Sequence, residues 1–213
     1  MQPFAFNTKY DQSILLGRKA KNLQTLLAGV RAVPESSLYF HTHRFLLQHH
    51  FLSPEPPNDF AYWATEVLND DPLGEKLSSV DILQYASLED LRTFFITVLD
   101  ESLQHADRLP DCPRGEEFHF MACRTFVLPT PYAADNLEAF SLILEHISIS
   151  ALYYHIFDAR LRLGRGDNDF SRWFADLGHE ELAAKMRMLD PYTQTLEGLR
   201  SHIITMVRDY DAH

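Results

Sequence analysis

The amino-acid sequence matches itself when it is shifted by 114 positions, and this internal repeat constrains the fold more than any other feature. The register holds without a gap from Phe4 to His41, and after a four-residue deletion it resumes at Asn58. The identical pairs are Phe4/Phe118, Phe6/Phe120, Ala20/Ala134, Asn22/Asn136, Leu23/Leu137, Ser36/Ser150, Leu38/Leu152, Tyr39/Tyr153, His41/His155, Asn58/Asn168, Asp59/Asp169, Phe60/Phe170, Trp63/Trp173, Leu88/Leu196, Glu89/Glu197, Leu91/Leu199 and Arg92/Arg200. Their order and spacing predict two copies of one folding unit.

The repeat predicts a mainly α fold, made of two tandem helical repeats that are related by a pseudo-twofold axis and are each opened by a short β-strand. The first repeat spans 1–105 and the second spans 116–213. The linker between them, 106–115, reads ADRLPDCPRG and is rich in proline and charge. We expect the two repeats to pack together as one body.

The expected elements follow from local patterns. Apolar residues recur three and four positions apart through most of each copy, which predicts helices. Asn58 and Ser87 precede such stretches and are residue types that cap helix N-termini. In contrast, 118–128 reads FHFMACRTFVL, is rich in aromatic and β-branched residues, and predicts a strand. We expect Phe4–Phe6 to be its counterpart and to pair with it across the pseudo-twofold axis.

The charge and the cysteine count exclude several classes of protein. With 19 Lys and Arg against 30 Asp and Glu, the net charge is −11, which repels phosphate backbones and argues against nucleic-acid binding. No run of about 18 apolar residues exists, so we expect no membrane-spanning helix. The two cysteines, Cys112 and Cys123, fit no disulfide framework and are expected to be free thiols of a cytoplasmic protein.

Four of the 11 histidines, His41, His43, His49 and His50, lie within ten residues. His41 has a counterpart in His155, so the simplest role of these two is packing within the shared fold, each ring hydrogen-bonded to backbone or to a carboxylate. The other three are particular to the first copy, and imidazole is a common ligand of zinc and iron. We therefore interpret His43, His49 and His50, together with His41 and His155, as candidate ligands of Zn or Fe.

Helical spacing limits how these imidazoles could share one ion. His41 and His43 are two positions apart and point to opposite sides of a helix. His43 and His50 share a face but lie about 10.5 Å apart along the axis. The sequence has no HExxH motif, in which two histidines lie four positions apart. A mononuclear site would therefore need further ligands, for which the candidates are His119, Glu145, His146, His155 and Asp158.

Two aromatic pairs also occupy matched positions, Tyr39-Phe40 and Tyr153-Tyr154. Such pairs pack in a core, or they line an apolar pocket into which their hydroxyl groups point. In the second interpretation, Tyr39, Tyr153 and Tyr154 would line a pocket for a small molecule.

The segment HTHRFLLQHHFLSPEPPNDFAYW, with EEFHF and LPTPY further along the chain, resembles a family of bacterial proteins classed as a domain of unknown function. The resemblance covers nearly the whole chain. It implies a bacterial or archaeal origin and a cytosolic setting, and it carries over no activity and no functional residue.

Three classes of function stay open. The first is an interaction or regulatory protein without catalysis, whose partner is another protein or a second copy. The second is a metal-binding protein, or a metal-dependent oxidoreductase or hydrolase, that uses the histidine cluster. The third is a small-molecule binder with a pocket between the two repeats. The sequence has no GxSxG motif and no phosphate-binding loop, so it identifies no catalytic residue and leaves open whether the protein is an enzyme.

Overall fold

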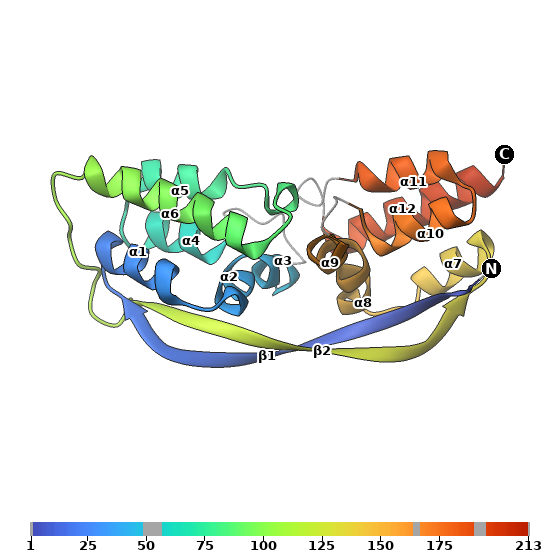
Figure 1. Cartoon of the computed structure of the whole chain (residues 1–213), viewed down its shortest axis with the longest axis horizontal. Coiled ribbons are helices and arrows are strands. Elements are labelled where there is room, and N and C mark those ends of the chain that lie inside the picture. Colours follow the sequence, from blue (N-terminus) through green and yellow to red (C-terminus); the bar gives the residue numbers. More distant parts are fainter. Residues whose placement is uncertain (1, 49–56, 164–166, 190–194, 213) are drawn as a thin grey trace. The chain divides into compact units, whose positions relative to one another are not determined.

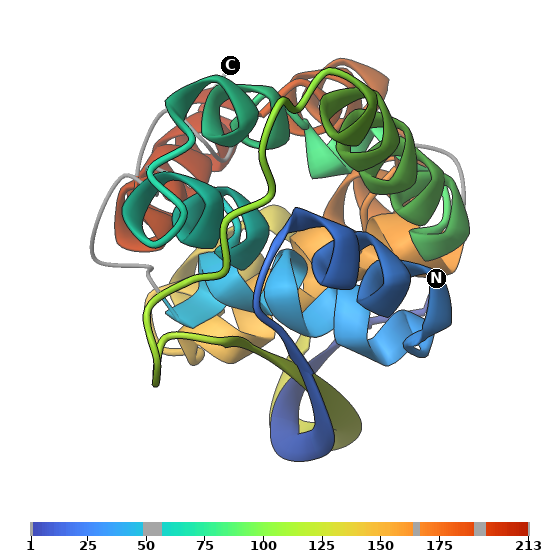
Figure 2. The ribbon, with the colours of Figure 1, turned by 90° about the vertical axis from the view of Figure 1, so that its left-hand side faces the viewer.

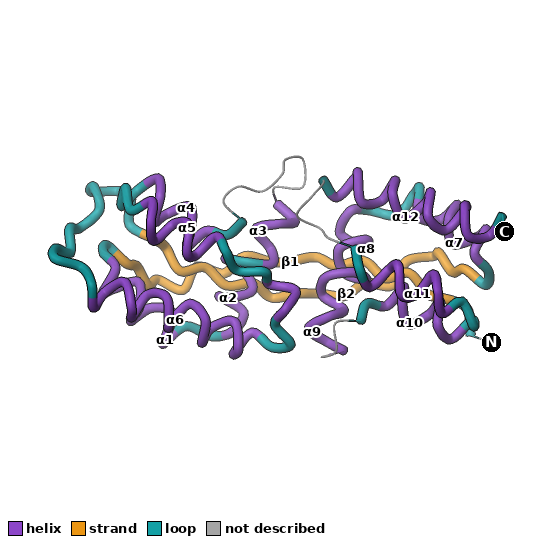
Figure 3. The backbone as a smooth tube through the Cα atoms, turned by 90° about the horizontal axis from the view of Figure 1, so that it is seen from above, coloured by secondary structure: helices purple, strands orange, loops and turns teal. Residues whose placement is uncertain are grey.

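The computed structural model describes residues 2–48, 57–163, 167–189 and 195–212. Two strands of 17 residues each, β1 (Phe4–Ala20) and β2 (Phe118–Ala134), pair into one two-stranded antiparallel sheet (Figures 1 and 3). Helices make up most of the remaining described residues.

The described residues form two compact units, and each strand contributes to both. Unit 1 comprises 2–10 together with the described part of 125–212, and unit 2 comprises 11–48 and 57–124. Strand β1 therefore starts in unit 1 and ends in unit 2, whereas β2 starts in unit 2 and ends in unit 1.

Unit 2 is mainly helical, and capping residues mark where several of its helices begin. Its elements are α1 (Leu23–Ala32), α2 (Glu35–His41), α3 (His43–Gln48), α4 (Asp59–Glu66), α5 (Asp71–Ser78), the 3-10 turn η1 (Ile82–Gln84) and α6 (Leu88–Gln104). The side chains of Asn22, Asn58 and Ser87 accept a backbone N–H three residues further on, which satisfies a donor that the helix leaves open. Helix α1 packs on α6, and α4 packs on α5 (Figure 2).

The core of unit 2 is built on aromatic rings from the start of β2. The ring of Phe118 stacks on that of Phe60 with 5.2 Å between centroids, and Phe60 in turn contacts Phe95. Phe120 lies against Gly29 of α1 so closely that a Cβ at position 29 would be 2.1 Å from the Phe120 ring. Glycine at this position therefore allows the strand to approach the helix.

Unit 1 has a corresponding set of helices. Its elements are α7 (Leu137–Leu144), α8 (Ile149–Tyr153), the π-helical turn η2 (Tyr154–Asp158), α9 (Ala159–Leu163), α10 (Asp169–Asp176), α11 (Glu180–Arg187) and α12 (Leu196–Asp211). Helix α12 packs on α7, and α10 packs on α11. The core again receives its rings from a strand, because Phe4 and Phe6 of β1 contact Phe140, with 6.0 and 5.5 Å between ring centroids.

A buried arginine closes the C-terminal end of one helix in each unit. Nη1 of Arg200 donates to the carbonyl oxygens of Leu144 and Ile147, both at 2.7 Å, where α7 ends. Arg92 makes the same pair of bonds at the end of α1. The last carbonyls of a helix lack partners within it and carry partial negative charge, so a guanidinium is well suited to this place.

The predicted fold class, a mainly α protein of two tandem helical repeats each opened by its own short β-strand, is wrong. The strands are long and form a single sheet, and the first residues of each strand pack on the helices that follow the other strand. The sequence pattern predicted strands only at 118–128 and at Phe4–Phe6, whereas both strands continue beyond these residues. Pairing keeps Pro129 and Pro131 within β2 despite their poor β-propensity, and β1 passes through Gly17 with a positive φ of 69°.

The boundaries 1–105, 106–115 and 116–213 were predicted from the repeat in the sequence, and they stay a prediction. The compact units are defined by contacts in the structure, and they divide the chain within β1 and β2.

Candidate functional site

The ring of His41 is held at both nitrogens inside unit 2. Its side chain is 3% exposed, and Nδ1 lies 2.7 Å from Oδ2 of Asp59. The backbone N–H of Met121, in β2, donates to Nε2 at 3.0 Å. A backbone N–H can only donate, so Nε2 is the unprotonated nitrogen of the ring. Nδ1 therefore carries the proton and donates a hydrogen bond to Asp59. His41 thus has no nitrogen left for a metal and links α2, α4 and β2.

His155 makes the same set of contacts in unit 1. The N–H of Asn7, in β1, donates to its Nε2 at 2.8 Å, and Nδ1 lies 2.8 Å from Oδ2 of Asp169. Arg162 also donates to this oxygen, at 2.8 Å. Burial by itself would raise the pKa of Asp169, but the bonds from His155 and Arg162 outweigh burial and lower the pKa. The carboxylate is therefore well suited to hold the neutral ring in one orientation.

His43 lies in the interior of unit 2, with 1% of its surface exposed. Its ring stacks on that of Tyr39, with 5.3 Å between centroids and 13° between planes. Nδ1 is 3.0 Å from the hydroxyl of Thr42, which itself donates to the carbonyl of Leu38. The hydroxyl proton is committed to that carbonyl, so Nδ1 of His43 is the donor in this contact.

The predicted metal ligands lie only partly within the described residues. His49 and His50 lie outside the described residues. Among the described residues, no cluster of three or more His, Cys, Asp and Glu side chains is placed to hold a metal ion. The metal site at His43, His49 and His50 stays a prediction.

The three tyrosines predicted to line a pocket are buried. Tyr39 belongs to unit 2, whereas Tyr153 and Tyr154 belong to unit 1. The guanidinium of Arg162 lies 4.2 Å from the centre of the Tyr154 ring, and burial raises the pKa of the Tyr154 hydroxyl. The pocket that these side chains would line also stays a prediction.

An ion pair that the sequence reasoning missed lies beside the π-helical turn of unit 1. Lys9 of β1 has a fully buried side chain, and its ammonium lies 2.7 Å from Oδ2 of Asp158. The same ammonium is 4.6 Å from the centre of the Tyr153 ring. The sequence held a signal for this pair. In the repeat, Lys9 aligns with Cys123 and Asp158 aligns with Arg44, so the two copies differ in charge at both positions.

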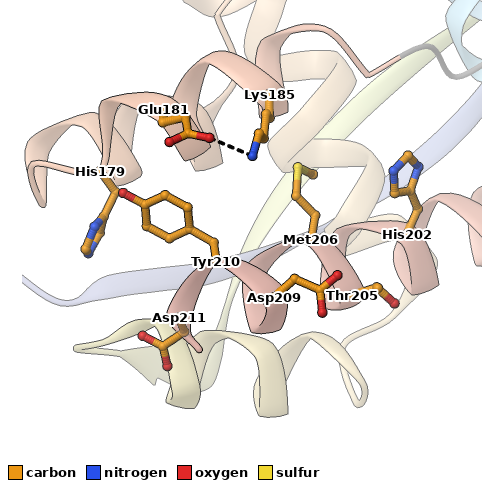
Figure 4. A pocket seen from close by; sticks show the side chains of 9 residues that line it. All are labelled: His179, Glu181, Lys185, His202, Thr205, Met206, Asp209, Tyr210 and Asp211. Carbon is orange, nitrogen blue, oxygen red and sulfur yellow. Dashed lines mark ion pairs between the residues drawn. The ribbon is translucent and has the colours of Figure 1, made fainter. Parts of the chain in front are cut away.

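A groove of about 880 Å³ lies between α11 and α12 (Figure 4). The half-buried side chains of Met206 and Tyr210 supply its apolar surface, and the ring of His179 meets that of Tyr210 edge-on at 5.4 Å between centroids. Carboxylates of Asp209 and Asp211 lie on the exposed side. An organic cation with an apolar body would match this lining.

One end of the groove carries an ion pair. Nζ of Lys185 lies 2.8 Å from Oε1 of Glu181, both in α11, and this ion pair lowers the pKa of the Glu181 carboxyl group (Figure 4). The sequence reasoning missed the groove, although α12 held a signal for it. His202 and Asp209 are seven positions apart and share a face that differs from the buried face of Ile203.

The last part of β2, residues 125–134, is named here the uncharged segment, because it contains no Asp, Glu, Lys, Arg or His. It nevertheless lies at the surface. Phe126 is 43% exposed, Val127 47%, Leu128 49% and Tyr132 39%, and Tyr10 of β1, in the same unit, is 61% exposed. Exposed apolar side chains that lie together in this way are typical of a binding surface.

The backbone of the uncharged segment is poorly suited to pairing with another strand. Pro129 and Pro131 have no N–H, and residues two apart direct their backbone groups to the same side of a strand. The hydroxyl of Thr130, between them, donates to the carbonyl of Phe6 in β1 at 2.6 Å. Prolines at the edge of a sheet prevent strand addition, so contacts at this segment must use its side chains.

No described helix is both long and apolar enough to cross a lipid bilayer.

Comparisons with known proteins place the chain among proteins of unknown function. The model of a family of unknown function, DUF5752, matches residues 1–208. A solved structure described as OrfY from Thermoproteus tenax is 31% identical, with a TM-score of 0.84, and the match covers 100% of this chain and 97% of that chain. No curated protein matches the chain.

Proposed function

The chain belongs to the family of unknown function DUF5752, and from that premise we propose that it is an interaction or regulatory protein that binds another protein and has no catalytic activity of its own. The uncharged segment of β2 carries this proposal. It exposes Phe126, Val127 and Leu128 in succession, in a chain whose net charge is −11. The partner would present an apolar surface without charged groups.

The size of the exposed surface agrees with this role. A fully accessible aromatic side chain offers about 150–250 Å² and an aliphatic one somewhat less. Val127 points to the opposite side of the strand from Phe126 and Leu128 and is left out of the sum. With the exposed fractions of Tyr10, Phe126, Leu128 and Tyr132, the surface amounts to roughly 300–450 Å². The largest apolar patch on a monomer is typically about 300–600 Å² and is often functional.

The buried histidines support the same proposal. His41 and His155 use both ring nitrogens to join strand to helix, so neither ring is available as a general base or as a metal ligand. Both rings thus join a strand to helices within their own unit.

Affinity capture with variant baits tests the proposal. The full chain, carrying a tag, is used in extracts of the cells that naturally produce it, and bound proteins are quantified by mass spectrometry. The test bait carries Phe126→Ser, Val127→Ser and Leu128→Ser. The matched control carries Ile14→Ser and Leu15→Ser, because these residues are 37% and 62% exposed on β1 but belong to unit 2.

The expected result is that one or more proteins bind the wild type and the control and are lost from the test bait. Circular dichroism of the three baits should be the same, because all the changed side chains are exposed. Equal recovery of every bound protein by all three baits would show that the uncharged segment is not the binding surface.

A further inference from the structure

We infer that, when no other partner is present, the uncharged segment is covered by a second copy of this chain, so that self-association and partner binding exclude one another. The inference rests on the proposed function in that both use the same surface. It adds the identity of one occupant and a form of regulation, since a partner would have to displace the second copy.

Electrostatics favours this segment as the place where two copies meet. Each copy carries a net charge of −11, so most approaches between two copies are repulsive. Residues 125–134 carry no charge, and contact there places no carboxylate directly opposite another. The lack of charge on residues 125–134 reduces like-charge juxtaposition, the usual barrier to self-association of an acidic protein.

The prolines determine how the copies would meet. Because Pro129 and Pro131 remove backbone donors from the strand, the two segments cannot extend each other's sheet. The contact must be made by side chains, with the same residues of both copies facing each other across a twofold axis. Phe126 and Leu128 lie two positions apart and share one side of the strand, so an aromatic and an aliphatic side chain would meet their counterparts from the second copy.

The exposed area limits the size of the interface that two copies can form. Two copies that each bury roughly 300–450 Å² would bury roughly 600–900 Å² in total. Specific interfaces usually exceed about 1,000 Å², so this contact is smaller than a typical specific interface and should be weak. We therefore expect an association that is weak enough for a partner with a larger interface to displace the second copy.

Sedimentation equilibrium of the full, untagged chain tests the inference, at about 1–500 µM and at two salt concentrations. The average mass should rise from 24.6 kDa toward twice that value as the concentration increases. Higher salt should strengthen the association by roughly threefold or more, because it screens the repulsion between the acidic copies while the uncharged contact is unaffected. An interface held by ion pairs would respond in the opposite direction.

Two variants test the surface, each with a matched control. The triple serine variant at 126–128 should stay monomeric, whereas Ile14→Ser with Leu15→Ser should associate like the wild type. Leu128→Glu introduces a single carboxylate and should abolish association, and Leu15→Glu should not. The pair of single changes keeps the test valid if the triple variant fails to fold.

A wild type that stays monomeric at every concentration would overturn the inference, and so would association that both 126–128 variants retain. Either result is separable from the proposed function, which depends on the capture of a different protein. If capture is lost from the test bait while the wild type is monomeric, the proposed function stands and only the second copy is excluded.

Discussion

Replacing His155 by phenylalanine is expected to lower the free energy of unfolding by about 3 kcal/mol. The phenylalanine ring keeps most of the packing against Phe4 and Phe170, whose centroids lie 4.9 and 5.6 Å from that of His155. The change therefore isolates the two ring nitrogens and the hydrogen bonds that they make.

The magnitude follows from those two bonds. The N–H of Asn7 loses its acceptor, and a buried donor without a partner costs about 1–3 kcal/mol. Asp169 loses the bond from Nδ1–H, and a hydrogen bond to a charged group contributes about 1.5–3 kcal/mol. Arg162 remains bound to Asp169, and the Asp169 side chain is 18% exposed, so the lower part of both ranges applies.

Urea unfolding followed by tryptophan fluorescence measures this loss. The chain has two tryptophans, Trp63 in unit 2 and Trp173 in unit 1, so a Trp63→Phe background reports on the unit that contains His155. The thermal midpoint should fall by roughly 6–12 °C. His146→Phe makes the same substitution at an exposed position and should change stability by less than about 0.5 kcal/mol. A loss below about 1 kcal/mol for His155→Phe would refute the assignment of both nitrogens to structural bonds.

Four further outcomes are expected. The pKa of Asp169 is lowered from 3.8 in the folded state, so the contribution of this carboxylate to stability is present above pH 3.8 and is lost as the pH falls through the folded pKa. Asp169→Asn should therefore flatten the dependence of the unfolding free energy on pH below about pH 4. Arg200→Met should cost about 2–3 kcal/mol in urea unfolding because the carbonyls of Leu144 and Ile147 lose their donor, whereas Arg200→Lys should recover part of the loss. Gly29→Ala should destabilise by about 1–3 kcal/mol through its clash with Phe120, and Phe120→Leu should lessen that effect in a double-mutant cycle. If the metal hypothesis at His43 is correct, elemental analysis of the untagged protein should find near-stoichiometric Zn or Fe, and an amount far below one per chain would end that hypothesis.

Features that depend on neighbouring residues could be derived from the sequence. The caps at Asn58 and Ser87 lie where their residue types and the following apolar pattern predict them, because capping joins groups only three positions apart. The interpretation of His41 and His155 as packed rings bonded to backbone and carboxylate was also open to sequence reasoning, since both copies hold them at matched positions.

Other features required the tertiary structure. The length of β1 and β2 depends on hydrogen bonds between segments about 100 or more positions apart, and no local pattern reports such bonds. The sequence therefore predicted strands only at 118–128 and at Phe4–Phe6. The ion pair of Lys9 and Asp158 likewise joins distant segments.

The sequence by itself determined the helical character of most of the chain, the capping residues and the matched side chains that fill the two cores, because these follow from short-range geometry and apolar burial. Only the tertiary structure decided that each strand supplies the core beside the other strand's helices, that both nitrogens of His41 and His155 are occupied, and that the uncharged end of β2 lies at the surface. These outcomes depend on which distant backbone groups satisfy one another, and that choice is made by the folded chain as a whole.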